Sequence, residues 1–290
     1  MSFEDVMTAV GRWMTATEAL AAMGAELSLA QRQDPGHPDV IRALRGVSAA
    51  ADLPRLDELP PPQREMVIGL IRMCLRQALD LVDDPGRQPG WTFTDPEILA
   101  GWGRGSMMVP GALAATAPEL ADVRAFLDVG TGVGLLAIAA ARTWPTASVT
   151  GIDVWEPALR MAAGNIESAG LGDRISVRRQ DVTDVDEAGS YDCVWFPTFF
   201  VSERVLDEAV PRLILSLRAG GWLVLGRMAP PPDRLAEATS ALRTIRGGGA
   251  DFGAKRLAAA LEDAGCPAVR VLPSQGPAPL EYVIGQAPGG

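Results

Sequence analysis

The stretch of sequence that decides the fold is Phe126-Leu127-Asp128-Val129-Gly130-Thr131-Gly132-Val133-Gly134-Leu135. Its apolar first half is typical of a buried β-strand, and three alternating glycines then lead directly into a helical pattern. Glycines are needed where a backbone turns sharply and lets a ligand approach closely. The pattern is D-x-G-x-G-x-G, and Leu135 stands where the dinucleotide fingerprint G-x-G-x-x-G has its third glycine. An acid inside the strand, Asp128, suits a ligand with an ammonium group better than a pyrophosphate.

Two further acids stand where the next two predicted strands end. Asp153 closes the run Val149–Asp153, nineteen residues after Gly134, and Asp181 follows the run Ile175–Gln180. An acid at the end of the second strand can accept both ribose hydroxyls of an adenosyl ligand, and Asp181 could accept from an adenine amino group. Because the carboxyl ends of parallel strands meet at one edge of a sheet, we expect the three acids to share one crevice.

From about residue 122, short β-type runs alternate with helical patterns, which predicts a parallel sheet covered by helices on both faces. The expected strands are Ala125–Gly130, Ser148–Asp153, Ile175–Gln180, Asp192–Phe196, Trp222–Arg227, Val269–Leu272 and Leu280–Ile284. The expected helices are Gly134–Thr143, Glu156–Ala169, Val205–Leu217, 233–246 and 252–264.

The first part of the chain reads differently, as helices without strands. Apolar residues at three- and four-residue steps predict helices over residues 3–32, 38–51 and 63–82, and a short one over 110–117, while residues 87–106 look turn-rich. We therefore predict two domains, a helical lid or oligomerisation region over residues 1–120 and a ligand-binding domain over residues 121–290.

Composition narrows the classes of partner. The 290-residue chain has a formal charge of −10, which argues against nucleic acid or an anionic membrane as partner. The start of the sequence lacks a secretory pattern, no apolar run is long enough for a membrane span, and the three cysteines form no C-x-x-C pair. We expect a cytoplasmic protein with free thiols and no metal. The single histidine, His37, leaves few candidates for a general base.

The glycine loop, Asp153, Asp181 and the turn Arg218-Ala219-Gly220-Gly221-Trp222 together resemble the class I S-adenosylmethionine-dependent methyltransferases over about residues 122–286. The resemblance implies a Rossmann-like, doubly wound α/β sheet of seven strands in the order 3-2-1-4-5-7-6, with the seventh strand antiparallel. It also implies S-adenosylmethionine as cofactor and S-adenosylhomocysteine as product.

The resemblance further implies roles at matched positions. The methionine part of the cofactor would be surrounded by Asp128, Gly130, Thr131, Gly132 and Gly134. Asp153 would hold the ribose, with Val154 or Trp155 beside it, and the adenine would be framed by Gln180, Asp181 and Val182. Trp195 and Phe196 would lie near the sulfonium and the acceptor. Packing in the core is the alternative for the aromatic run that begins at Trp195. Arg104 and Trp91 are candidates to reach the cofactor or to form a lid.

The acceptor is expected to be a small aromatic or heteroaromatic molecule of bacterial specialised metabolism, held by Phe196, Phe199, Phe200 and Trp91. The chain lacks the late histidine base of plant-type O-methyltransferases, and Phe196-Pro197-Thr198 stands where adenine-N6 enzymes have Asn/Asp-Pro-Pro-Tyr. We therefore expect in-line displacement driven by positioning without a core histidine base. Glu203, Tyr191, His37 and Asp192 are the weak candidates for a base.

Two other classes of function stay open from the sequence. The chain could cyclise or cleave S-adenosylmethionine at the sulfonium instead of transferring its methyl group, or it could bind the cofactor as a non-catalytic module. The N-terminal helices could form a homodimer interface.

Overall fold

The structure is a computed structural model that describes residues 2–53, 55–230, 233–272 and 280–289. The chain divides into two compact units, which we describe separately. The helical unit comprises residues 1–85 and 96–102, and the sheet unit comprises residues 86–95 and 103–290. None of the helices in the described ranges is long and apolar enough to cross a membrane.

The helical unit is built from α1 (Phe3–Arg32), α2 (Pro38–Ala50), the 3-10 turn η1 (Leu56–Glu58), α3 (Pro61–Asp83) and the first part of α4 (Pro96–Ser106). Ser2 and Asp5 form a reciprocal capping box that begins α1. The unit has a small core of its own around Leu27, Leu56 and Ile68, packed between α1 and α3. The three predicted N-terminal helices are confirmed, with ends within two residues of the predicted ones.

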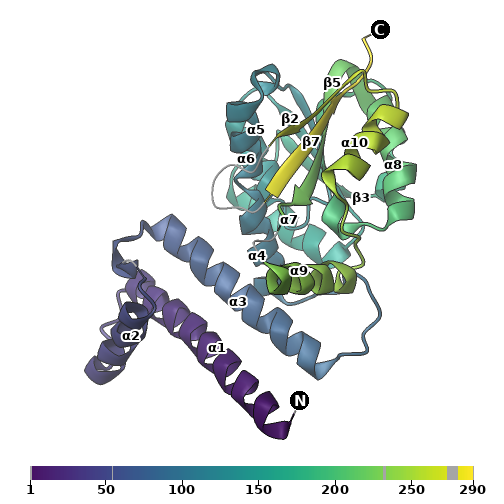
Figure 1. Cartoon of the computed structure of the whole chain (residues 1–290). Coiled ribbons are helices and arrows are strands. Elements are labelled where there is room, and N and C mark those ends of the chain that lie inside the picture. The colour runs from purple at the N-terminus through teal and green to yellow at the C-terminus, as the bar shows by residue number, and fades with distance from the viewer. Residues whose placement is uncertain (1, 54, 231–232, 273–279, 290) are drawn as a thin grey trace. The chain divides into compact units, whose positions relative to one another are not determined.

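The sheet unit holds seven strands in the order β3-β2-β1-β4-β5-β7-β6, as the resemblance implied (Figure 1). The strands are β1 (Ala125–Val129), β2 (Ser148–Asp153), β3 (Ile175–Arg179), β4 (Tyr191–Pro197), β5 (Leu217–Met228), β6 (Ala268–Leu272) and β7 (Leu280–Gln286). β1 to β5 run parallel, and β7 runs antiparallel to both of its neighbours. The doubly wound fold is therefore confirmed.

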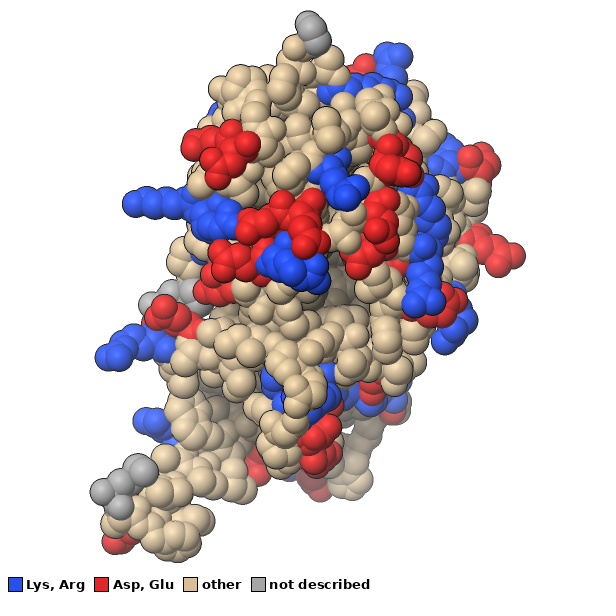
Figure 2. Space-filling model, turned by 90° about the vertical axis from the view of Figure 1, so that its right-hand side faces the viewer, with Lys and Arg blue, Asp and Glu red and all other residues tan. Residues whose placement is uncertain are grey.

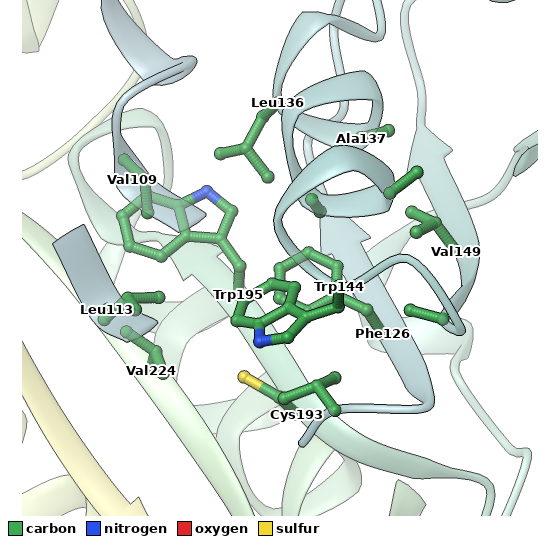
Figure 3. Packing of buried hydrophobic residues seen from close by; sticks show 14 of the residues in the cluster. Val109, Leu113, Phe126, Leu136, Ala137, Trp144, Val149, Cys193, Trp195 and Val224 are labelled. Carbon is green, nitrogen blue, oxygen red and sulfur yellow. The ribbon is translucent and has the colours of Figure 1, made fainter. Parts of the chain in front are cut away.

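Two separate cores cover the two faces of the sheet. The first contains side chains of α5 (Val109–Thr116), α6 (Leu135–Thr143) and α7 (Glu156–Ser168), and the second contains those of α8 (Glu203–Ser216) and α10 (Ala254–Asp263). Phe126 and Leu127, neighbours on β1, enter opposite cores because successive strand side chains alternate between faces. Figure 3 shows part of the first core, with Trp195 and Phe126 among its large rings. The remaining elements are α9 (Arg234–Arg246), η2 (Pro118–Leu120), η3 (Val182–Asp184) and η4 (Thr198–Phe200).

Two predictions about the region before β1 were wrong. Residues 96–106, predicted as turns, form α4, because two of its glycines are sites of close packing: a Cβ on Gly103 would lie 2.5 Å from Val133, and one on Gly101 would lie 2.9 Å from Met73. The domain boundary lies at residues 102 and 103 and not near 120, since α5 and η2 contribute Leu113 and Leu120 to the first core of the sheet.

Candidate functional site

The glycine loop follows β1 and adopts a backbone that only glycine takes without strain. Gly130, Gly132 and Gly134 have φ angles of +66°, +56° and +76°, all in the left-handed region. The backbone N–H of Thr131 donates to the carbonyl of Ile152 at 3.0 Å, which fixes the loop against β2. A Cβ on Gly132 would meet only the Gly130 carbonyl oxygen, at 3.9 Å, whereas one on Gly134 would lie 3.1 Å from Ala162. Gly132 therefore faces open space, and Gly134 allows α6 to pack on α7.

Asp128 braces this loop from inside. Its side chain is 1% exposed, and Oδ2 accepts the Thr131 hydroxyl at 2.7 Å. The backbone N–H of Ala137, in the first turn of α6, also donates to this carboxyl. Burial raises the pKa of Asp128 to about 7, and the hydrogen bond from Thr131 opposes this rise only in part. The structure thus shows Asp128 and Thr131 as a buried pair that holds the loop, and their contact with an ammonium group stays a prediction.

Asp153, at the end of β2, presents its carboxyl group to the backbone of the glycine loop and of the turn that follows β2. Its Oδ2 accepts the N–H of Gly132 and its Oδ1 accepts the N–H of Trp155, both at 2.8 Å. An ionised carboxylate offers about four acceptor positions; the backbone N–H of Val154 also bonds to this carboxyl, so capacity remains for a ribose hydroxyl. Burial raises the pKa of Asp153, and the N–H donors of Trp155 and Gly132 lower it in part. The remaining acceptor capacity of this carboxylate fits a hydroxyl of the ribose of the implied cofactor.

The end of β3 lies at the same edge. The N–H of Gln180 donates to the carbonyl of Asp153 at 3.0 Å, which joins β3 to β2 at this point. Asp181 is exposed, and its Oδ1 accepts both the N–H and the hydroxyl of Thr183, so it caps η3. Val182 is a member of the second core. Adenine contacts by Gln180 and Asp181 stay predictions, while Val182 serves packing.

Trp195 and Phe196, at the end of β4, are placed differently from our expectation. Trp195 is 2% exposed and lies in the first core, and Phe196 is 1% exposed and lies in the second (Figure 3 shows Trp195). Gly226 makes room for the indole, because a Cβ there would overlap the Trp195 ring. These two rings therefore pack the core, which was the alternative reading, and the expected contacts with cofactor and acceptor are corrected on that ground.

The aromatic side chains that remain at this edge follow β4 and precede α4. Phe199 and Phe200 lie 4.5 Å apart, and Trp91 meets Phe200 edge-on at 4.9 Å. All three are only partly buried. Phe93, which the sequence analysis missed, lies 5.3 Å from Trp91, and its carbonyl accepts the Trp155 indole N–H at 2.8 Å. The alternation Trp91-Thr92-Phe93 is the signal that could have identified it.

The candidate bases are not gathered at this edge. Tyr191 begins β4, so it lies at the amino edge of the parallel strands, opposite the glycine loop, and is 6% exposed. Asp192 at the same edge accepts the N–H groups of Arg124 and Ala125. The catalytic predictions for these two residues were therefore wrong, because β4 runs parallel to β1 and begins where β1 begins.

Glu203, His37, Arg104 and Val154 complete the predicted set. Glu203 begins α8, is exposed and pairs with Arg256 at 3.4 Å. His37 is an exposed residue of the helical unit that caps α2 through Nδ1, which accepts the N–H of Asp39. Arg104 lies in the last turn of α4, and Val154 is exposed beside Asp153. Within the described ranges, no group of three or more His, Cys, Asp or Glu side chains could hold a metal ion.

Comparisons with known proteins agree with this geometry. Residues 126–221 match the family described as methyltransferase domain. The nocamycin O-methyltransferase of Saccharothrix syringae is 37% identical over 119 residues, which cover 40% of this chain and 42% of that protein. The release factor glutamine methyltransferase of Rhodopirellula baltica is 31% identical over 101 residues, 34% of each chain. The chain thus spans less than half the length of these curated relatives.

Solved structures match over nearly the whole length. An O-methyltransferase family protein from Burkholderia thailandensis superposes with a TM-score of 0.67 at 15% identity, covering 100% of this chain and 99% of that one. The mitomycin 7-O-methyltransferase MmcR gives 0.69 at 19% identity, covering 98% of each chain. The match to the methyltransferase-domain family covers residues 126–221, and the solved structures share the fold over nearly the whole chain. The fold, the glycine loop and this match together support the resemblance to the class I S-adenosylmethionine-dependent methyltransferases.

Proposed function

We propose that this chain transfers the methyl group of S-adenosylmethionine to a hydroxyl group of a small aromatic or heteroaromatic acceptor, in bacterial specialised metabolism. The observation that carries the proposal is the row of partly buried rings at the edge that holds Asp153. Trp91, Phe200 and Phe199 form a continuous series of ring contacts there. A Cβ on Gly130 would lie 3.5 Å from Pro197, so the end of β4 that carries these rings adjoins the glycine loop.

A protein or tRNA acceptor is less well supported, although several relatives are named for such acceptors. Those matches cover 19% to 50% of this chain, and the match to the nocamycin O-methyltransferase covers 40%, so the extent of the matches does not separate the two kinds of acceptor. Phe196-Pro197-Thr198-Phe199 stands at the end of β4, where adenine-N6 enzymes have the tetrad Asn/Asp-Pro-Pro-Tyr. The chain carries a formal charge of −10, and Figure 2 shows acidic and basic side chains interleaved on the face that it presents. Binding to a polyanion requires a concentration of basic groups instead.

The chain's own residues supply binding and orientation in this proposal. Asp153 would hold the ribose, the brace of Asp128 and Thr131 would keep the loop in place, and the partly buried rings would exclude water and align the acceptor. When bound, the cofactor supplies an activated methyl group on a sulfonium. The acceptor oxygen would displace S-adenosylhomocysteine from that methyl group, the electron pair of the carbon–sulfur bond would stay on sulfur, and the hydroxyl proton would be released to bulk solvent with the product.

No candidate base of the sequence analysis is placed to take the hydroxyl proton of the acceptor. His37 is the only histidine of the chain and belongs to the helical unit. Glu203 pairs with Arg256. The rate should therefore depend on how readily the acceptor hydroxyl ionises, and positioning supplies the rest of the acceleration.

We also propose that the helical unit forms a homodimer, because the first half of α1 exposes large apolar side chains. Phe3 is 80% exposed, Met14 56% and Trp13 47%. Exposed patches of this kind are typical of interaction sites. Light scattering should give twice the chain mass for the wild-type protein and the single mass for a Trp13→Glu, Met14→Glu variant. A wild-type monomer would contradict the proposal.

We propose a cytoplasmic location because the three cysteines, Cys74, Cys193 and Cys266, are all free, and Cys74 is exposed. Disulfide bonds form and persist in oxidising compartments, whereas thiols stay reduced in the cytoplasm.

The test is incubation of the protein with S-adenosylmethionine and a bacterial metabolite extract, followed by mass spectrometry. The expected result is S-adenosylhomocysteine together with a product that has gained one methyl group, and both should be lost with Asp153→Ala. Methylthioadenosine would instead indicate cyclisation or lysis at the sulfonium. If calorimetry shows tight binding of S-adenosylmethionine and none of a wide range of acceptors is turned over, the result would favour a non-catalytic module.

A further inference from the structure

Residues 86–95, which we call the strap, belong to the sheet unit although helical-unit residues flank them on both sides. Three contacts hold the strap. The N–H of Gly90 donates to the carbonyl of Arg246 at 3.0 Å, the Trp91 ring meets Phe200 at 4.9 Å, and the Phe93 carbonyl accepts the indole N–H of Trp155 at 2.8 Å. The strap therefore lies against the ends of β4 and β2.

Trp155 donates two hydrogen bonds, one to Asp153 and one to the strap. Its backbone N–H donates to Oδ1 of Asp153, and its indole N–H donates to the Phe93 carbonyl, both at 2.8 Å. One residue thus joins the carboxylate that fits the ribose to the backbone of the strap. Trp155 precedes α7 directly and has no side-chain capping bond there, so the indole is not needed to begin that helix.

The strap in turn places two of the rings at this edge. Phe93 lies 5.3 Å from Trp91, and the guanidinium group of Arg87 lies 4.8 Å from the centre of the Phe93 ring. Arg87 also donates to the carbonyl of Gly90 and to the hydroxyl of Thr92, so the strap is braced internally. Fixing the Phe93 carbonyl therefore fixes the position of the aromatic pair relative to Phe200.

We propose that Trp155 is a positioning residue that couples cofactor binding to the strap, so that the aromatic acceptor site is completed after S-adenosylmethionine binds; this rests on the proposed function. A ribose hydroxyl that donates to Asp153 would hold its carboxylate in one orientation, and Oδ1 of that carboxylate then holds the Trp155 N–H in place. When the backbone of Trp155 is held in place, its indole N–H holds the Phe93 carbonyl of the strap in place as well. By linkage, the factor by which bound cofactor strengthens acceptor binding equals the factor by which an acceptor that orders the strap strengthens cofactor binding.

The test uses Trp155→Phe, which keeps an aromatic ring and removes the indole N–H. The matched control is Trp144→Phe, which removes an equivalent bond, from the Trp144 indole to the carbonyl of Leu120 at 2.8 Å in the core. Amide hydrogen exchange of residues 86–95 is measured by mass spectrometry with and without saturating S-adenosylhomocysteine. A thermal melt of each variant checks that it folds.

We expect S-adenosylhomocysteine to slow exchange of the strap about tenfold in the wild-type protein and in Trp144→Phe, and less than about twofold in Trp155→Phe. Calorimetric affinity for S-adenosylhomocysteine is measured for each variant, so that exchange is compared at saturation in every case. Once an acceptor is identified, this variant should raise its KM more than it lowers kcat. Retained protection in Trp155→Phe would overturn the coupling.

A second readout needs no variant. The indole N–H of Trp155, followed by nuclear magnetic resonance in the wild-type protein, should exchange more slowly when S-adenosylhomocysteine is bound. Binding without any change in this signal or in the strap would overturn the coupling and leave the proposed function intact. Absence of calorimetric binding to the wild-type protein would overturn both.

Discussion

Oδ2 of Asp153 accepts the backbone N–H of Gly132 at 2.8 Å, so the acid that ends β2 and the middle glycine of the loop after β1 form one unit. The loop is held from below by a second acid, Asp128, through Thr131. One carboxylate is thus largely committed to the loop, while the other retains acceptor capacity at the edge of the sheet. Asp128 therefore stabilises the loop, and Asp153 remains able to bind a ligand.

The first prediction concerns the ribose carboxylate. Asp153→Ala removes the acceptor for a ribose hydroxyl and should weaken binding of S-adenosylhomocysteine by at least about tenfold, since a lost hydrogen bond to a charged group costs about 1.5–3 kcal/mol. Isothermal titration calorimetry measures the change. Glu208→Gln, which alters an exposed acid paired with Arg204 on α8, is the control and should bind normally. Unchanged affinity in Asp153→Ala would remove the ribose assignment.

The second prediction separates two glycines that the motif treats alike. Both have positive φ, so alanine introduces strain of about 1–2 kcal/mol at either position. At Gly134 the new Cβ would also press on Ala162 at 3.1 Å, whereas at Gly132 it would point into open space. Gly134→Ala should therefore lower the free energy of unfolding more, and Gly132→Ala should lose more cofactor affinity than its stability change explains. Urea titration and calorimetry on both variants make the comparison.

The sequence identified the fold and the cofactor edge because both depend on local chemistry. Short stretches of sequence are enough to predict the alternating strands and helices, the glycine loop and the position of Asp153. The burial of Trp195 could not be predicted in this way, because it depends on Gly226, which lies 31 residues further along the chain on the neighbouring strand β5. The strap was equally hidden, because Phe93 and Trp155 meet only through a bond between residues 62 positions apart.

The same reasoning explains why α4 was missed. Gly101 and Gly103 look like helix breakers in the sequence, since glycine costs about 1 kcal/mol in a helix interior. Their neighbours Met73 and Val133 leave no space for a Cβ, and these contacts lie 28 and 30 residues away along the chain. Tertiary packing thus overrides propensity here, and no pattern near these residues in the sequence indicates it.

A third prediction follows from the reassignment of Trp195. Trp195→Phe should lower the free energy of unfolding by about 1–3 kcal/mol, because it removes buried ring atoms from the first core. It should leave the affinity for S-adenosylhomocysteine within about threefold. Chemical denaturation and calorimetry give the two values. A large loss of affinity without loss of stability would restore the cofactor role that burial argues against.

A fourth prediction concerns the ring row. Trp91→Ala should raise the KM for the acceptor that the mass-spectrometric screen identifies by roughly three- to tenfold, because aromatic pairs contribute about 0.5–1.5 kcal/mol beyond area burial. Affinity for S-adenosylhomocysteine should change little. Steady-state kinetics with Trp91→Phe as the conservative variant completes the test, and that variant should recover part of the loss. An unaltered KM in Trp91→Ala would place the acceptor elsewhere.

The last prediction is a dependence of stability on pH that comes from Asp128. Burial, opposed in part by the bond from Thr131, raises its folded-state pKa to about 7 from an ordinary 3.8, so the folded protein holds a proton that the unfolded chain has released between these values. Stability from this group is therefore present at low pH and is lost as the pH rises toward 7, by about 1.4 kcal/mol per pH unit. Urea titrations at pH 5 and pH 8 should show the wild-type protein losing roughly 3 kcal/mol relative to Asp128→Asn, whose side chain does not ionise. A constant difference between the two proteins across this range would mean that Asp128 is ionised throughout, and that the ammonium group of the cofactor meets a full negative charge at every pH.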